Sequence, residues 1–277
     1  MRILVAVDLA VSGHDWLIGR ASDLAGHLDA TLDITYVRSP DVSLASIDNF
    51  LAQLRMLLSK VEPARRGVPR CEVGVPDDVL VELSSEYDAL VVGPREPGAL
   101  ERMLRGTMAV RILLRAHCPV LIPRAKLWDA EATPRILVAV DINGPNQDKV
   151  VGFAARWGQT LGGRLDAVYA VAESIPHIKE ATVRERAEQE WLATHSSELD
   201  KVKSILATIP EDIRGEALLR RGQPEAVLVA MSSNYHMVAL GNRERGGLTG
   251  FILGAVAQHV VRNARCDVLT LPTADLA

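Results

Sequence analysis

Two aspartates in this sequence end apolar runs, and a glycine-containing loop lies farther along the chain after each of them. Asp8 ends the run Arg-Ile-Leu-Val-Ala-Val-Asp, and Asp141 ends a second run of the same seven residues. The residues that bound the loops are Gly93, Gly106, Thr107, Gly241 and Gly254. A carboxylate accepts hydrogen bonds from ligand hydroxyl and amino groups, and backbone N–H groups in a glycine loop before a helix can surround an anion. These residue types predict the binding of a small polar or phosphorylated molecule.

The sequence lacks the residue sets that usually carry catalysis. No Ser–His–Asp or Cys–His arrangement is discernible, and no pair of histidines has metal-binding spacing. The Walker A pattern G-x4-G-K-[ST] is absent. The segment from Asp8 to Gly13 has one glycine, whereas a dinucleotide-binding fingerprint needs several. We therefore expect a binding protein rather than an enzyme.

The chain repeats itself, and the repeat determines how the aspartates and the glycine loops are positioned. The two apolar runs are 133 residues apart, whereas later landmarks are 148 residues apart. These later pairs are Gly93 and Gly241, Gly106 and Gly254, and Cys118 and Cys266. The second copy has therefore gained 15 residues between its second and third strands. We expect one domain over residues 1–124, a polar linker, and a second domain over residues 134–273.

Each copy alternates short apolar runs with amphipathic segments. In the first copy, the apolar runs predict strands at residues 2–8, 32–37, 70–75, 89–93 and 120–122. Leucine and alanine at helical spacing predict helices over residues 14–28 and 44–61, and further helices precede the fourth and fifth strands. This alternation is typical of a doubly wound α/β fold, in which helices cover both faces of a parallel sheet. The fold expected for each domain is a five-stranded sheet of order 3-2-1-4-5.

That strand order places the candidate ligand groups. In a doubly wound sheet, ligands bind beyond the carboxyl ends of the strands, where the strand order reverses. The reversal brings Asp8 beside Gly93 in the first copy and Asp141 beside Gly241 in the second. Two interpretations stay open for each residue type. The aspartates either bind a ligand or cap the turn after the strand, and the glycines either approach a phosphate or only permit tight turns.

The 15 extra residues fall on one element. Residues 178–206 predict a single long helix in the second copy, with a charged face in solvent and with Trp191 packed on the core. We expect this helix either to cover the mouth of the second cleft or to form a contact between the chains of a homodimer. The apolar fifth strands, near 120–122 and 268–271, are expected to pair the copies about a pseudo-twofold axis, because an exposed apolar edge promotes aggregation.

Composition restricts the partners and the location of the protein. The net charge is −4, which gives no electrostatic attraction to nucleic acid. No apolar run is long enough for a signal-peptide core or a membrane-spanning helix, so we expect no membrane insertion. Cys71, Cys118 and Cys266 lie far apart without a CxxC motif and are expected to be buried thiols. The sequence therefore predicts a cytoplasmic location.

The combination of motifs resembles the universal stress proteins of the UspA superfamily. Members of this family carry I-L-V-A-V-D on strand one, G-x2-G-x9-G-[ST] after strand four, and C-P-V-L-V on strand five. The matching segments here are Ile3 to Asp8, Ile136 to Asp141, the two glycine loops, Cys118-Pro-Val-Leu-Ile122 and Cys266-Asp-Val-Leu-Thr270. The resemblance covers nearly the whole chain in two copies, and the chain looks most like the E-type tandem members.

The resemblance implies ATP as a ligand, as in some members of the family. There the strand-one aspartate and the end of strand two hold adenosine, and the glycine loop with its Ser or Thr holds the phosphates. The positions carried over are Asp8, Val37, Gly93, Gly106 and Thr107 in the first copy, and Asp141, Ala170, Gly241 and Gly254 in the second. Magnesium is expected to assist such binding.

Three residues depart from the family pattern. Glu96 and Glu244 replace the second glycine of the two loops, and Ala255 replaces the hydroxyl residue in the second copy. A glutamate repels a phosphate charge by about 4 kcal/mol at about 4 Å and an effective dielectric of about 20. The expected function is therefore a non-catalytic stress-response or binding protein with degenerate nucleotide sites. The alternatives are an ATP-binding switch that acts mainly through the first domain, with slow ATP hydrolysis or autophosphorylation, and an enzyme of a related nucleotide-binding fold.

Overall fold

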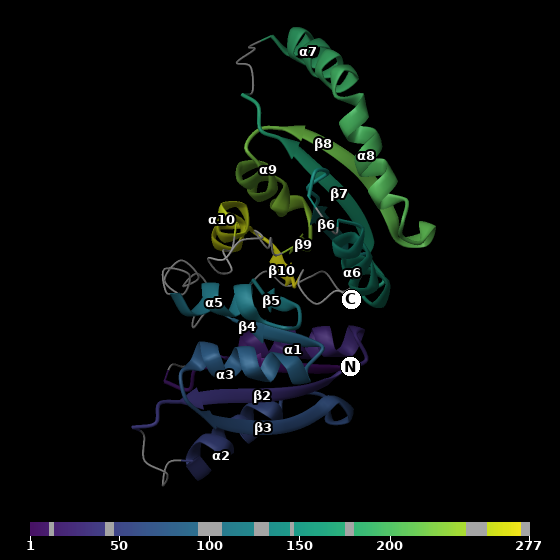
Figure 1. Cartoon of the computed structure of the whole chain (residues 1–277). Coiled ribbons are helices and arrows are strands. Elements are labelled where there is room, and N and C mark those ends of the chain that lie inside the picture. Colours follow the sequence, from purple (N-terminus) through teal and green to yellow (C-terminus); the bar gives the residue numbers. More distant parts are fainter. Residues whose placement is uncertain are drawn as a thin grey trace.

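In the computed structural model, one sheet runs through the whole molecule and helices cover both of its faces (Figure 1). The structure describes residues 1–10, 14–41, 47–93, 107–124, 133–144, 147–174, 180–241 and 254–272, with the backbone alone over 107–110. Within these ranges the sheet has ten strands. The α/β class and the tandem arrangement predicted from the sequence are confirmed.

The first half alternates strands and helices. Its described strands are β1 (Arg2–Ala6), β2 (Thr31–Arg38), β3 (Arg66–Val73), β4 (Ala89–Val92) and β5 (Val120–Ile122). Its described helices are α1 (Asp15–His27), α2 (Ile47–Leu58), α3 (Pro76–Leu83) and α5 (Thr107–Arg115), with 3-10 turns at Pro63–Arg65 and Ser84–Glu86. The apolar runs form central strands because both of their faces are covered: Ile3, Leu4 and Val5 are all fully buried.

The second half repeats this order and adds one helix. Its described strands are β6 (Arg135–Ala139), β7 (Arg164–Val171), β8 (Arg214–Arg221), β9 (Met237–Gly241) and β10 (Asp267–Leu271). Its described helices are α6 (Gln147–Thr160), α7 (Ala181–Thr194), α8 (Ser196–Leu206), α9 (Pro224–Met231) and α10 (Ala255–Asn263), with 3-10 turns at Glu211–Ile213 and Ser232–Asn234. The added helix is α7, which lies at the outer end of this half (Figure 1).

The strands are ordered β3-β2-β1-β4-β5-β10-β9-β6-β7-β8 across the sheet. Each half therefore has the order 3-2-1-4-5, and neighbouring strands within a half are parallel. The halves meet where β5 and β10 pair antiparallel, with Leu121 opposite Leu269. This contact confirms the predicted pairing through the fifth strands. Because strand direction reverses there, the carboxyl ends of the strands of the two halves lie at opposite edges of the sheet.

Alternation along the strands directs side chains into two layers of core. One layer lies under α1, α2, α6 and α8 and includes Ile3 and Leu24. The other lies under α3, α5, α9 and α10 and includes Leu4 and Val260. Each layer contains residues of both halves, so the core is continuous across the junction of β5 and β10.

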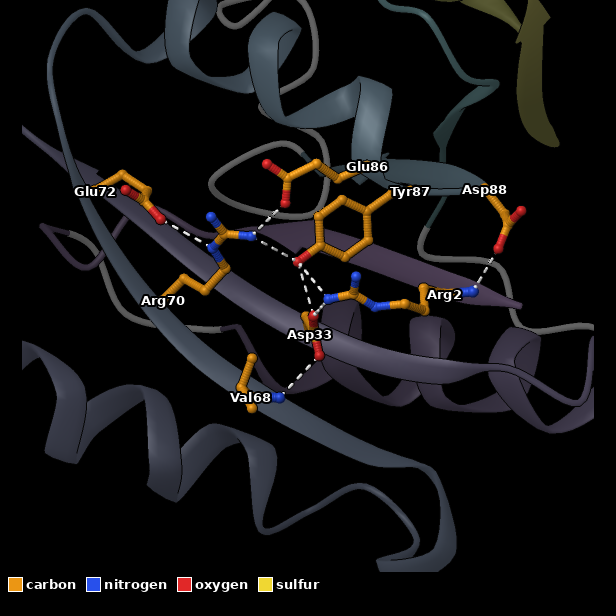
Figure 2. A network of polar contacts seen from close by, with 8 residues as sticks. All are labelled: Arg2, Asp33, Val68, Arg70, Glu72, Glu86, Tyr87 and Asp88. Carbon is orange, nitrogen blue, oxygen red and sulfur yellow. Dashed lines mark hydrogen bonds and ion pairs between the residues drawn. The ribbon is translucent and has the colours of Figure 1, made fainter.

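A buried aspartate connects the strands of the first half near their amino ends (Figure 2). Asp33 on β2 accepts hydrogen bonds from Nη2 of Arg2 and from the hydroxyl of Tyr87, both at 2.7 Å. It also accepts the backbone N–H of Val68 on β3 at 2.8 Å. Burial, and then the hydrogen bond to Asp33, raises the pKa of Tyr87. A Cβ on Gly67 would lie 1.8 Å from Oδ1 of Asp33, so the carboxylate requires glycine there.

The second half contains the same anchor. Asp166 accepts hydrogen bonds from Nη2 of Arg135 at 2.6 Å and from the hydroxyl of Tyr235 at 2.8 Å. The backbone N–H of Glu216 completes the set at 2.8 Å, and a Cβ on Gly215 would lie 1.9 Å from Oδ1 of Asp166. The repeat therefore extends beyond the apolar runs to a buried polar network.

Two expectations about elements need correction. The single helix expected over residues 178–206 is two helices, because His195 between them has φ −102° and ψ 26°, outside the helical region. The third strand begins at Arg66 rather than at residue 70. As β3 is an edge strand, many of its side chains are only partly buried, so it lacks the apolar run that marks a central strand.

Candidate functional site

Three of the candidate residues of the first half lie at one edge of the sheet. β1 pairs with β2 on one side and with β4 on the other, so the strand order reverses between β1 and β4. Asp8 lies just beyond the end of β1, and Gly93 directly follows β4. Val37 is the second-last residue of β2. The carboxyl ends of three adjacent strands thus bring these residues to the position where doubly wound sheets bind ligands.

The carboxylate of Asp8 takes part in the turn that follows β1. Its Oδ1 accepts the backbone N–H of Ala10 at 3.1 Å. Asp8 also acts on its surroundings: burial raises the pKa of Tyr36 on β2, and the negative charge of Asp8 raises it further. The turn-capping interpretation of Asp8 is therefore supported, and its charge acts at the candidate ligand edge.

Gly93 has a packing reason to be glycine. A Cβ at this position would lie 2.6 Å from Cδ1 and 2.7 Å from Cδ2 of Leu17. Leu17 lies in the first turn of α1 and is 2% exposed, so it has little freedom to move away. Glycine here lets α1 approach the end of β4, and this requirement holds whether or not a phosphate binds.

The second half repeats the arrangement at the opposite edge. Asp141 follows β6, Ala170 lies near the end of β7, and Gly241 is the last residue of β9. Oδ1 of Asp141 accepts the backbone N–H of Asn143 at 3.2 Å, and its own backbone N–H donates to Oε1 of Gln147 at 2.7 Å. This turn is therefore held from both sides by side-chain hydrogen bonds.

The helices after the glycine loops begin differently in the two halves. α10 begins at Ala255, and Gly254 before it has φ −55° and ψ 146° without a side-chain cap on the helix. A Cβ on Gly254 would meet none of the described residues within 4 Å. α5 begins at Thr107. The side chain of Thr107 lies outside the described residues, as do Gly106, Glu96 and Glu244.

A cluster that sequence reasoning missed lies at the carboxyl ends of β7 and β8. The indole N–H of Trp191 on α7 donates to Oε2 of Glu173 at 2.8 Å. The guanidinium carbon of Arg221 is 4.7 Å from the centroid of the Trp191 ring. Nε2 of His195 is 3.2 Å from Oε1 of Glu173. The hydrogen bond from Trp191, followed by the charges of His195 and Arg221, lowers the pKa of Glu173.

This Trp191 cluster, made of Glu173, Trp191, His195 and Arg221, belongs to the second half alone. The repeat offsets make Pro40 the counterpart of Glu173 and Val73 the counterpart of Arg221. The sequence signal was charge at two positions, residues 173 and 221, whose counterparts in the first copy are uncharged. Trp191 is 5% exposed, which confirms that it packs on the body of the protein.

Other chemistry is limited in the part of the chain that the structure describes. No group of three or more histidine, cysteine, aspartate or glutamate side chains is placed to hold a metal ion in these ranges. None of the helices described there is long and apolar enough to span a membrane. Burial raises the pKa of Cys118 and of Cys266 to about 12, whereas Cys71 is only partly buried.

Comparison with known sequences identifies relatives along the whole chain. A family model described as the universal stress protein family matches residues 1–124 and again residues 133–272. One universal stress protein of Mycobacterium tuberculosis is 25% identical over 270 residues, which cover 96% of this chain and 92% of the relative. Another from the same species is 28% identical over 201 residues, or 70% of this chain. The match spans only 65% of the length of that second relative.

Solved structures share the fold over almost the entire length. A universal stress protein of Archaeoglobus fulgidus superposes with a TM-score of 0.64 at 18% identity, covering 98% of this chain and 97% of that one. A functionally unknown protein of Pseudomonas aeruginosa superposes with a TM-score of 0.66 at 16% identity, covering 99% of this chain and 93% of that one. At such identities the likeness extends to the fold.

Proposed function

Because the chain belongs to the universal stress protein family, we propose that it is a non-catalytic binding protein of the stress response, with two nucleotide-type sites that have diverged from each other. The first site is the edge beside Asp8 and Gly93, and the second is the opposite edge beside Asp141 and Gly241. Each site is a receptor for a ligand rather than a centre of reaction.

The start of α10 supports this proposal most directly. Among the residues that the structure describes, no side chain caps the first N–H groups of α10, which begins at Ala255 after Gly254. Such N–H groups and the helix dipole attract a phosphate. The hydroxyl residue of the family pattern is replaced by Ala255, however. The second site therefore retains the backbone part of a phosphate site and lacks the side-chain part, which is what a degenerate site implies.

The residues of the first half fit ATP better and support the second candidate function, an ATP-dependent switch. A hydroxyl residue, Thr107, begins α5. Asp8 places a carboxylate at the carboxyl end of β1, and a carboxylate accepts hydrogen bonds from ribose hydroxyls or from an adenine amino group. ATP bound there would supply a phosphoryl group for slow hydrolysis or autophosphorylation. Glu96 adds a negative charge to the loop that would hold the phosphates, and magnesium would offset that charge.

Calorimetric titration of the full chain with ATP and magnesium chloride tests the two functions. Degenerate sites predict no binding tighter than about 1 mM, whereas a switch predicts about one site per chain at about 10 µM or tighter. If ATP binds, Asp8→Asn should abolish the heat when the ligand occupies the first half, and Asp141→Asn should abolish it when the second is occupied. Asp200→Asn, on the exposed face of α8, is the control.

An assay of phosphate release on the same samples tests the non-catalytic part of the proposal. The non-catalytic proposal is wrong, and the ATP-dependent switch is favoured, if phosphate is released faster than in buffer alone and Asp8→Asn abolishes this release. The three free thiols favour a reducing compartment, and a cytoplasmic location is part of the proposal.

A further inference from the structure

The contact between the two halves is symmetric in its backbone and asymmetric in its charge. β5 and β10 pair with Leu121 opposite Leu269, and these residues are counterparts under the 148-residue offset of the repeat. A pseudo-twofold axis therefore passes between them. It relates each residue near the contact to a counterpart in the other half, and the residues around the two lie at equivalent positions.

On one side of this axis lies a charged triad, made of Arg20 and Arg124 from the first half and Asp267 from the second. Asp267, at the start of β10, is 1% exposed and accepts hydrogen bonds from Nε of Arg20 at 3.0 Å and from its Nη2. Arg20 lies on α1 of the first half and is 3% exposed. The backbone N–H of Arg124 donates to the other oxygen of Asp267 at 2.8 Å. The guanidinium of Arg124 donates to the carbonyls of Ala264 at 2.9 Å and Val261 at 2.6 Å.

The other side of the axis carries no charge at the equivalent positions. The counterparts of Arg20, Arg124 and Asp267 are, in that order, Phe153, Pro272 and Pro119. Pro272 and Pro119 are buried, and Phe153 is partly buried. Proline has no backbone N–H, so Pro272 also lacks the donor that Arg124 provides. One side of the contact is thus ionic and hydrogen-bonded, and the other is apolar.

This asymmetry penalises any contact between two like halves. If two first halves paired through β5, each Arg20 would face a Pro119 and would lose the Asp267 carboxylate. If two second halves paired through β10, each Asp267 would face a Phe153 and would lack both the cation and the backbone donor. Removing one partner of a buried ion pair costs about 3–5 kcal/mol, and a like pairing would incur this cost at each of its two equivalent positions. Only the unlike pairing satisfies every charge.

We propose that the charged triad of Arg20, Arg124 and Asp267 is a selectivity device on the strand-five surface. It makes the first half accept a second half and reject another first half. The partner that fits this surface is therefore the second half of the same chain. Backbone pairing alone does not discriminate, because the apolar fifth strands of the two copies are alike and would pair in any combination.

A cysteine at the axis distinguishes the pairings. Leu121→Cys is introduced after the native cysteines are replaced by alanine. In a like pairing of first halves, the symmetry places this cysteine opposite its copy in another chain, whereas in the native pairing it faces Leu269. Each variant is unfolded, refolded and oxidised, and disulfide-linked dimers are counted. Leu121→Cys with Leu269→Cys should instead give a bridge within one chain, which verifies the native pairing.

The test variant is Arg20→Met with Asp267→Asn, which removes both charges and keeps both shapes. We expect few linked dimers without these changes and at least about ten times more with them. The control is Arg135→Met with Asp166→Asn, an ion pair inside the second half, which should lower stability without raising the number of linked dimers. Equal numbers with and without the test changes, or an equal rise in the control, would overturn the proposal. If circular dichroism shows the test variant unfolded, Arg20→Gln with Asp267→Asn, which removes both charges and keeps a neutral polar pair, is judged by the same outcomes.

Discussion

At the scale of single residues, close contacts decide which side chains the repeat tolerates. The carboxylate of Asp33 occupies the space that any side chain at residue 67 would need, and Asp166 does the same at residue 215. At residue 93, Leu17 occupies the space that a side chain would need. In all three cases, a glycine belongs to the packing of the fold, so glycine at these positions does not by itself indicate a ligand.

A comparison of two alanine substitutions tests the hypothesis that these glycines are required by packing. Gly67→Ala should lower the free energy of unfolding by about 3 kcal/mol, because the new Cβ displaces the Asp33 carboxylate from its hydrogen bonds. Gly19→Ala, on the exposed face of α1 with nothing within 4 Å of a Cβ, should raise it by about 0.5–1 kcal/mol. Urea unfolding curves measure both changes. Equal effects of the two substitutions would contradict the packing role.

The thiols should differ in reactivity. Burial raises the pKa of Cys118 and Cys266 to about 12, so both remain protonated and shielded at pH 8. Cys71 on β3 is only partly buried, and its pKa is raised to a lesser extent. A disulfide reagent should therefore modify about one thiol per folded chain and all of them in denaturant. Cys71→Ser should eliminate the reaction of the folded protein. Rapid modification of Cys118 before unfolding would disagree with this expectation.

The loop glutamates should control nucleotide affinity, if ATP binds at all. Glu96→Gly removes the charge that opposes phosphate in the first half and should strengthen ATP binding by about tenfold or more. Glu244→Gly should help less, since Ala255 still lacks a hydroxyl that contributes about 0.5–1.5 kcal/mol. Calorimetry with magnesium and ATP compares the two. The glutamates are not the obstacle if neither change improves binding, and tighter binding in the second half would reverse the asymmetry.

At the scale of elements, the second half differs from the first mainly in α7. Only the end of this helix packs on the body, where Trp191 is buried, while most of its other residues are exposed. α8 is the counterpart of α2 and contributes Val202 and Leu206 to the core. The 15 extra residues therefore add an outer element and leave the doubly wound domain intact.

Acid should loosen the contact that holds α7. The hydrogen bond from Trp191 lowers the pKa of Glu173, so its stabilising effect is present above the ordinary glutamate pKa of about 4.3 and is lost as pH falls below it. Subtracting the fluorescence of Trp191→Phe from that of the parent isolates the emission of Trp191. This difference should change as the pH falls below about 4.3, before the protein unfolds. Glu173→Gln should weaken the change. A difference spectrum that stays constant down to global unfolding would refute the assignment.

Replacing α7 by a short flexible linker should leave the rest of the protein folded. We expect far-ultraviolet circular dichroism and cooperative unfolding to persist, because Trp191 is its only fully buried side chain. Ligand access to the second site or the oligomeric state should change, as measured by calorimetry and sedimentation. Loss of cooperative unfolding would mean that α7 belongs to the core.

Central strands were predictable from the sequence, whereas edge and inserted elements were not. The run from Ile3 to Val5 is apolar throughout because both faces are buried. β3 lies at the sheet edge and carries no such run, so its start was misplaced. The break lies at His195, whose side chain contacts Glu173 at the end of β7, and no local sequence pattern indicates that contact. For the same reason, sequence reasoning found Asp8 and Asp141, which end apolar runs, and missed Arg221.

At the scale of the whole molecule, the two halves share one sheet and one continuous core. The sheet is continuous across β5 and β10, and both layers of core contain residues of each half. The candidate sites lie at opposite edges of this sheet, so one small ligand cannot contact both. The junction of β5 and β10, where Arg20 and Asp267 pair, lies between the two sites.

Breaking the buried pair at this junction should uncouple the halves. Arg20→Met leaves Asp267 buried without its cation and should cost about 3–5 kcal/mol. Differential scanning calorimetry should show one transition for the parent and a lower, broader or split transition for the variant. Arg65→Met, which removes pairs with the exposed Asp29 and Glu62, should cost less than about 1 kcal/mol. A variant as stable as this control would show that the pair does not hold the halves together.

The unequal sides of the junction also bear on the ancestry of the chain. A dimer of identical chains must present the same residues on both sides of its axis, so every substitution at such a contact appears twice. A carboxylate facing an arginine on one side and a proline near a phenylalanine on the other requires two copies that mutate independently, as gene duplication allows. Asp267 and Pro119 therefore record divergence that followed duplication of the domain.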